Sequence, residues 1–247
     1  MNNSNNWQTS STKQQTIWFD GELFNRFPTE YFESQYWLQE GLITGESKGR
    51  YTTYFIATKT KTNASIELVL RHYYRGGLVA KISKDSFVYT GAKNTRAVKE
   101  LNLLKAMLEM GLPVPRPIAA MVSKSSAIFC KNDIIIERIA GAQDLFHYLL
   151  NQPLHADGWQ AVGATIKQFH QAGVFHSDLN IHNILIDNNQ KIWLIDFDRC
   201  DIRSVQSSWQ QANLDRLLRS LNKELSLAST FHFSTENWQQ LLAGYTN

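Results

Sequence analysis

Residues 176–187, HSDLNIHNILID, and residues 194–198, LIDFD, decide how this chain folds and what chemistry it can carry. Transfer of a phosphoryl group needs a carboxylate that accepts the proton of the attacking hydroxyl, and Mg²⁺ that neutralises phosphate charge. Asp178 can be that carboxylate. Asn183 lies five residues later and Asp196 lies 18 residues after Asp178, and both can offer oxygen atoms, which Mg²⁺ prefers as ligands. The spacing therefore predicts Asp178 as the catalytic base and Asn183 and Asp196 as metal ligands.

The surroundings of these residues favour a catalytic loop followed by a β-hairpin. Two short apolar runs, residues 184–186 and 192–195, flank the turn DNNQ. This arrangement resembles the protein-kinase-like superfamily, whose catalytic loop is His-x-Asp-x-x-x-x-Asn and whose metal motif is Asp-Phe-Gly. The residues that match are His176, Asp178, Leu179, Asn183, Asp196 and Phe197. We expect His176 to hold the loop rather than to act chemically. The alternative interpretation is a polar loop whose Asp and Asn side chains only cap turns.

The first half of the chain reads as strands arranged around one helix. Four runs are β-prone: residues 52–58, 66–72, 118–122 and 134–138. Asn94 or Thr95 can cap a helix between the second and third runs, and its apolar stripe consists of Ala97, Leu101, Leu104 and Leu108. A short amphipathic helix is predicted after Pro28. The order is therefore β-β-α-β-β.

The second half is predicted to be mostly helical. The helices expected there run from Asp157 to Gly173, over 209–224 and over 235–245. Residues 1–16 are rich in Asn, Gln, Ser and Thr and are predicted to be a disordered tail. The expected architecture is an α+β, protein-kinase-like bilobal fold. Its small β-rich N-terminal lobe would cover residues 17–138, and its mostly helical C-terminal lobe would cover residues 139–247.

A basic strand residue and an acidic helix residue form the second candidate constellation. In the superfamily, a strand Lys holds the nucleotide phosphates and a helix Glu orients it. Strand alternation places Val69 and Arg71 on one face, which resembles the family's Ala-x-Lys, and Glu100 lies beside the apolar stripe of the next helix. We therefore expect Arg71 and Glu100 to bind ATP. The chain departs from the pattern by having Arg for Lys, and the alternative is that both are surface charges.

Weaker patterns complete the predicted nucleotide site. Gly45 and Gly49 in TGESKGRYTTYF resemble a degenerate glycine-rich phosphate loop, although an ordinary turn explains them equally well. The run IIIERIAG at 134–141 lies where the hinge between lobes is expected. Order along the chain then predicts that backbone near Glu137–Ile139 meets the adenine edge of ATP.

Several departures argue against a protein substrate. Asp198 replaces the Gly of Asp-Phe-Gly, and Asn180 replaces the catalytic-loop Lys usual in Ser/Thr protein kinases. Between Cys200 and Asn213 there is no room for a long activation segment. Small-molecule kinases of the superfamily share these reductions.

Longer stretches carry a narrower resemblance. They are GRYTTYFI, VLRHYYRGGLVAKISKD, GLPVPRPIAA and the catalytic-loop and metal motifs, within roughly residues 40–225. They resemble the 3-deoxy-D-manno-octulosonic acid (Kdo) kinases, a family of lipopolysaccharide-core sugar kinases. The resemblance implies ATP- and Mg²⁺-dependent phosphorylation of the 4-hydroxyl of Kdo on a lipid A precursor. It also implies a peripheral location on the cytoplasmic face of the inner membrane.

The basic residues near LRHYYRGG agree in part with such a lipid substrate. Positive charge gathers beside Tyr73, Tyr74 and Leu78 through Arg71, His72, Arg75, Lys81 and Lys84. This surface would suit an anionic glycolipid on an anionic membrane, and the alternative is a solvated hairpin loop. Rival functions are a heptose kinase, an aminoglycoside- or choline-type phosphotransferase, and a catalytically inactive nucleotide-binding scaffold.

Composition excludes some other classes. The 247-residue chain has a formal net charge of +3, which is too weak to argue for nucleic-acid binding. Its two cysteines, Cys130 and Cys200, form no CxxC motif, so neither zinc nor a disulfide framework is expected. The first residues contain no apolar secretory signal. We therefore expect a protein made and kept in the cytosol, able to touch a membrane surface.

Overall fold

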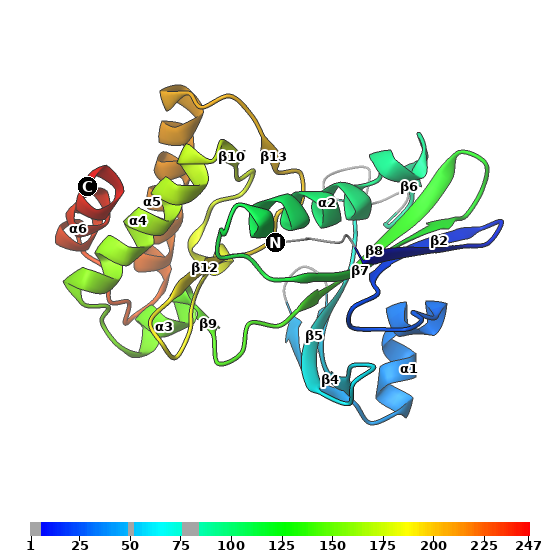
Figure 1. Ribbon diagram of the computed structural model, residues 1–247. Helices are drawn as coiled ribbons and strands as arrows, with labels where there is room; N and C mark the ends of the chain where they lie inside the picture. The colour runs from blue at the N-terminus through cyan, green and yellow to red at the C-terminus, as the bar shows by residue number, and fades with distance from the viewer. Residues whose placement is uncertain (1–5, 49–51, 76–83) are drawn as a thin grey trace. The chain divides into compact units, whose positions relative to one another are not determined.

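The computed structural model describes residues 6–48, 52–75 and 84–247. The chain forms two compact units (Figure 1). The first contains residues 1–105 and 116–138, and the second contains residues 106–115 and 139–247. Helix α2 (Arg96–Glu109) runs through the boundary at Lys105, so its last turn and the proline-rich segment after it belong to the second unit.

An antiparallel sheet is the framework of the first unit. Its strands lie in the order β1-β2-β7-β8-β5-β4-β3, and β6 pairs with β8. The strands are β1 (Trp7–Ser11), β2 (Gln15–Asp20), β3 (Ile43–Lys48), β4 (Thr52–Lys59), β5 (Ser65–His72), β6 (Phe87–Val88), β7 (Pro117–Lys124) and β8 (Phe129–Glu137). The four runs predicted as strands are β4, β5, β7 and β8, and the predicted helix is α2.

The two faces of this sheet are covered differently (Figure 1). One face packs against an aromatic cluster from the segment that holds the 3-10 helix η1 (Thr29–Phe32) and the helix α1 (Ser34–Gln39). Trp37 is the most buried member of that cluster, with 1% of its surface exposed. The other face lies under α2, where Val98 packs with Val122 and Cys130. Burial on both faces explains why most of β7 and residues 134–136 of β8 read as continuous apolar runs.

The expectation that residues 1–16 form a disordered tail is wrong for residues 7–16. Strand β1 pairs with β2 in an unbroken register from Trp7–Asp20 to Ser11–Thr16, and β2 pairs in turn with β7. The polar composition is misleading because β1 is an edge strand that faces solvent and needs no apolar side chains. The backbone hydrogen bonds to β2 and the burial of Ile17 and Phe19 keep this hairpin in place.

The second unit is built from four helices. They are α3 (Leu145–Asn151), α4 (Ala156–Gln171), α5 (Ser207–Leu227) and α6 (Thr235–Thr246). The sequence predicts all of these except α3, which Asp144 caps by accepting a hydrogen bond from the His147 N–H. Helices α4 and α6 cross closely, since a Cβ atom on Gly163 would lie 1.9 Å from the Leu241 carbonyl oxygen. Glycine is required at this crossing.

Short strands complete the second unit and hold its loops. Strand β11 (Ile184–Ile186) lies between β12 (Ile192–Leu194) and β9 (Gln143–Asp144), and β10 (Val174–Phe175) pairs with β13 (Asp201–Ile202). The β11–β12 hairpin is the one that the sequence predicts, with Ile184 opposite Leu194. Among the described residues, no helix has the length and apolar character needed to cross a bilayer.

Candidate active site

His176 holds the predicted catalytic loop of the second unit. This loop runs from β10 to the 3-10 helix η4 (Ile181–Asn183), which leads into β11. The His176 Nδ1 atom accepts the Asp178 N–H at 3.2 Å, so Nε2 carries the proton and donates it to the Ile195 carbonyl oxygen at 3.0 Å. Burial lowers the pKa of His176, which favours this neutral form. His176 therefore ties Asp178 to the segment that carries Asp196, as a structural role requires.

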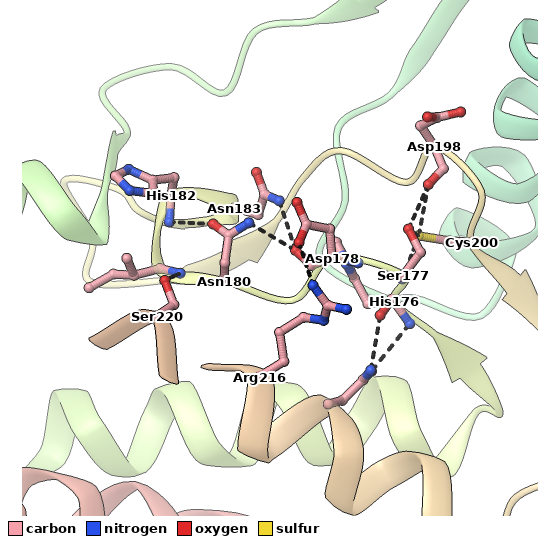
Figure 2. Close-up of polar contacts among 12 residues, drawn as sticks. His176, Ser177, Asp178, Asn180, His182, Asn183, Asp198, Cys200, Arg216 and Ser220 are labelled. Atoms are coloured by element: carbon pink, nitrogen blue, oxygen red, sulfur yellow. Dashed lines mark hydrogen bonds and ion pairs between the residues drawn. The ribbon is translucent and has the colours of Figure 1, made fainter. Parts of the chain in front are cut away.

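Asp178 exposes its carboxylate and uses its backbone to order the loop. Figure 2 shows the Asp178 side chain beside Arg216, whose Nη1 atom lies 3.1 Å from the carboxylate Oδ1 atom. The backbone carbonyl of Asp178 accepts hydrogen bonds from Nδ2 of Asn180 at 3.1 Å and of Asn183 at 2.9 Å. The Asp178 side chain is 56% exposed, so a hydroxyl group can reach it.

Asn183 and Asp196 offer oxygen atoms from two adjacent segments. The Ile195 N–H donates to the Asn183 carbonyl oxygen at 3.0 Å and joins the two segments. The Nδ2 atom of Asn183 is used by Asp178, so its Oδ1 atom is the side-chain atom left to accept or to ligate. Asp196 has a left-handed backbone with φ of 63°, a conformation that marks functional sites when the surroundings enforce it.

Phe197 is part of what enforces that conformation. It is 1% exposed and packs against Phe169 at 5.8 Å and against His176 at 5.0 Å, measured between ring centroids. The next residue, Asp198, accepts the Ser177 hydroxyl on its backbone oxygen at 2.8 Å (Figure 2). The metal motif is therefore anchored on both sides of Asp196.

The donor atoms here fit Mg²⁺ better than a transition metal. Within the described ranges, no three His, Cys, Asp or Glu side chains gather as a metal cluster would require. Mg²⁺ needs only one or two protein oxygen ligands when phosphates and water fill its other positions. One amide oxygen from Asn183 and one carboxylate from Asp196 meet that need.

In the first unit, the predicted pairing of Arg71 with Glu100 is confirmed. Glu100 of α2 is buried, with 3% of its surface exposed, and the Nη2 atom of Arg71 on β5 lies 2.5 Å from both of its carboxylate oxygens. Tyr73, which sequence reasoning missed, donates its hydroxyl to Glu100 Oε2 at 2.5 Å. Burial raises the pKa of Tyr73 well above its usual value and keeps it a donor. Tyr73 directly follows β5 and continues the alternation of Val69 and Arg71, which is the signal that could have identified it.

Only part of the predicted basic substrate surface lies within the described residues, and two of its basic members are held by carboxylates. Tyr73 is buried, and His72 lies between two carboxylates, with Nδ1 2.5 Å from Asp133 and Nε2 3.2 Å from Asp85. Arg71 points to Glu100. These side chains point into the protein because their partners are buried or half-buried. The predicted members Leu78 and Lys81 lie outside the described residues.

The remaining predicted nucleotide residues stay predictions. Gly45 lies within β3 next to a bulge, opposite Phe55 of β4, and Gly49 lies outside the described residues. Glu137 ends β8, and its N–H donates to the Arg116 carbonyl oxygen at 2.8 Å. That N–H is therefore committed to the sheet and cannot also serve an adenine base.

Helix α5 holds the catalytic loop through a polar stripe that the sequence analysis did not identify. The pairs are Asn213 with the His176 carbonyl oxygen (3.0 Å), Arg216 with Asp178 (3.1 Å), Ser220 with the Ile181 N–H (3.3 Å) and Glu224 with His182 (3.4 Å). The four members are three or four residues apart, so they lie on one helix face. Polar residues at this spacing in an otherwise apolar helix are the signal from which the stripe could have been predicted.

Comparisons with known proteins agree with this geometry. A sequence model of the lipopolysaccharide kinase (Kdo/WaaP) family matches residues 34–245. A relative from Photobacterium profundum, named 3-deoxy-D-manno-octulosonic acid kinase, is 39% identical over 231 residues, which are 94% of each chain. A relative with the same name from Vibrio parahaemolyticus is 43% identical over 211 residues, covering 85% of this chain and 86% of the relative.

The fold is also that of a solved structure. The structure of WaaP in complex with acyl carrier protein superimposes with a TM-score of 0.54 at 16% identity, covering 90% of this chain and 83% of that one. This likeness, together with the family match, confirms the predicted α+β, protein-kinase-like fold.

Proposed function

Because the chain belongs to the lipopolysaccharide kinase (Kdo/WaaP) family, we propose that it transfers the γ-phosphoryl group of ATP to Kdo on a lipid A precursor. The accepting group is the 4-hydroxyl of Kdo, and the reaction belongs to assembly of the lipopolysaccharide inner core. The observation that carries the proposal is the catalytic loop. It exposes the Asp178 carboxylate and places the Asn183 side chain against the backbone of the same residue.

Each of the predicted site residues has one task in this reaction. Asp178 accepts the hydrogen bond of the attacking hydroxyl and then its proton. Asn183 and Asp196 would hold Mg²⁺, which would neutralise charge on the ATP phosphates when bound. His176 keeps Asp178 and the metal motif in register through its two ring nitrogens. Arg71 of the first unit, oriented by Glu100, contacts ATP phosphates with its guanidinium.

We further propose that the protein works on the cytoplasmic face of the inner membrane. The first unit carries an exposed apolar group, the β6–β8 tip, which consists of Val88, Ile128 and Phe129 with 62%, 60% and 38% of their surfaces exposed. Val88 pairs with Phe129 across β6 and β8, so both side chains point to the same side of the sheet.

Three lysines lie on the segments beside this tip. Lys124 and Lys131 belong to the same hairpin, and Lys131 forms an ion pair with Asp85 at 2.7 Å. Lys13 lies in the neighbouring turn, where the Gln14 carbonyl oxygen accepts the Lys124 N–H at 2.7 Å. Exposed apolar groups with lysines on neighbouring segments suit the headgroup region of an anionic bilayer. This tip is the exposed apolar surface that supports membrane contact.

One reaction tests the enzymatic proposal. The purified protein is incubated with ATP, Mg²⁺ and Kdo–lipid IVA, and the phosphate is located by NMR. Phosphorylation at the Kdo 4-hydroxyl is expected. Turnover of a heptose-bearing acceptor alone would instead assign a heptose kinase, and ATP binding without transfer to any acceptor would assign an inactive scaffold.

A further inference from the structure

Arg216 differs from the other members of the polar stripe on α5. Asn213 and Glu224 are 2% and 8% exposed and are used up in holding the catalytic loop. The side chain of Arg216 is 47% exposed, and within the described part of the chain its ion-pair partner is Asp178 alone. Arg216 therefore brings a solvent-accessible guanidinium directly to the catalytic base.

This placement restores a positive charge that the catalytic loop itself lacks. Asn180, two residues after Asp178, occupies the position of the Lys found in Ser/Thr protein kinases, and it carries no charge. Its side chain accepts the His182 N–H and donates to the Asp178 carbonyl oxygen, so it orders the loop. The cation beside Asp178 comes instead from a helix 38 residues later in the chain.

The acceptor in the proposed reaction is an acid. In the pyranose ring of 3-deoxy-D-manno-octulosonic acid, the carboxylate is attached to C2 and the accepting hydroxyl to C4. Only one ring carbon, C3, lies between these two carbons. A site that aims the 4-hydroxyl at Asp178 must therefore bring the carboxylate close to the same residue. A second negative charge beside Asp178 is unfavourable unless a cation lies between them.

We propose that Arg216 binds the carboxylate of the acid sugar and thereby selects acidic acceptors. The planar guanidinium can offer paired N–H donors to a carboxylate, a match that Lys does not provide. The Arg216–Asp178 distance of 3.1 Å places this fork where the acceptor must lie when its hydroxyl meets the base. The proposal rests on the proposed function and adds the residue that recognises the substrate.

The test combines a change in the enzyme with a change in the acceptor. Wild-type protein and Arg216→Gln are assayed with the Kdo-bearing acceptor and with the same acceptor converted to its C1 carboxamide. In wild type, kcat/KM is expected to fall roughly 10- to 100-fold on amidation, because charge-assisted hydrogen bonds between the guanidinium and the carboxylate are lost. Arg216→Gln is expected to be equally slow with both acceptors, with an unchanged KM for ATP.

The control is Arg219→Gln, which removes the same charge from the next turn of α5. Arg219 is exposed, and it should keep the wild-type preference for the acid. If Arg216→Gln also keeps that preference while wild type phosphorylates Kdo, the proposed role of Arg216 is wrong and the enzymatic assignment stands. If wild type phosphorylates neither acceptor, the enzymatic assignment itself fails, and the role of Arg216 fails with it.

Discussion

The backbone carbonyl oxygen of Asp178 accepts a hydrogen bond from Nδ2 of Asn183 at 2.9 Å. A carbonyl can only accept, so this bond fixes which end of the Asn183 amide faces the loop and which end is left for a cation. The proposed base and the proposed metal ligand are thus positioned by one contact. Because the contact uses the backbone of Asp178, it survives substitution of the carboxylate.

The first prediction therefore concerns Asp178→Asn. This substitution keeps the shape of the side chain and the bond to Asn183, and it removes the proton acceptor. We expect kcat to fall by roughly 10²-fold or more, with the Kd for ATP nearly unchanged. Steady-state kinetics and calorimetric ATP titration measure the two quantities. Near-normal turnover would remove Asp178 from its assigned role.

The second prediction separates the two proposed metal ligands. Asp196→Ala should abolish measurable turnover, because a charged ligand is lost. Asn183→Ala should lower activity less and should recover partly as Mg²⁺ is raised. Asn180→Ala is the matched control, since Asn180 also donates to the Asp178 carbonyl oxygen but is not assigned to the metal. If the Mg²⁺ dependence of Asn183→Ala equals that of Asn180→Ala, the ligand assignment is wrong.

Local patterns in the sequence predict those features whose cause is local. The catalytic loop and the β11–β12 hairpin follow from residue spacing and from two short apolar runs. The pairing of Arg71 with Glu100 follows from strand alternation and from a helix stripe. The strand β1 escapes prediction because an exposed edge strand needs only backbone partners, which composition does not reveal.

Local sequence patterns could not predict contacts between segments that lie far apart in the chain. The polar stripe on α5 is recognisable only once the helix lies against the catalytic loop. Its members Ser220 and Glu224 contact loop residues that lie 39 and 42 positions earlier in the chain. The orientation of His72 was misjudged for a similar reason. Its partner Asp133 comes from β8, which lies beside β5 in the sheet although it is 61 residues away in the chain.

The third prediction tests Arg71, Glu100 and Tyr73 as one unit. Arg71→Ala and Glu100→Ala should each raise the KM for ATP, and the double variant should be little worse than the worse single one. Arg71→Lys should be impaired, since a compact ammonium cannot span the same oxygens. If the fold-changes in the KM for ATP of the two single variants multiply in the double variant, the two residues act independently.

Tyr73→Phe isolates the hydroxyl that donates to Glu100. The ring is retained, and with it the contacts of the Arg71 and Arg96 guanidinium groups, which lie 5.2 Å from the ring centroid. Loss of one buried bond to a carboxylate should raise the KM for ATP by roughly 3- to 10-fold. In a Glu100→Ala background the same substitution should have no further effect.

The fourth prediction concerns the β6–β8 tip. Changing Val88, Ile128 and Phe129 together to Ser should reduce sedimentation of the protein with phosphatidylglycerol vesicles by roughly 10-fold or more, because three apolar side chains no longer insert. Leu38→Ser is the matched control, since Leu38 is 60% exposed on α1 of the same unit. Equal vesicle binding by wild type and the triple variant would place the membrane contact elsewhere.

The fifth prediction follows from the position of His72 between Asp133 and Asp85. Burial alone would lower the pKa of His72, but hydrogen bonds and charge from the two carboxylates outweigh it and raise the pKa above its usual value. A folded-state pKa above the unfolded one means that protonated His72 stabilises the fold. This stabilisation is complete below the unfolded pKa, near 6.5, and is lost as pH rises through the folded value.

We therefore expect His72→Gln to lower the free energy of unfolding by about 1–3 kcal/mol at pH 6, and by less at pH 9. Urea denaturation at both pH values measures this, with His155→Gln, an exposed histidine before α4, as control. A loss of equal size at both pH values would mean that His72 acts through packing and not through its charge.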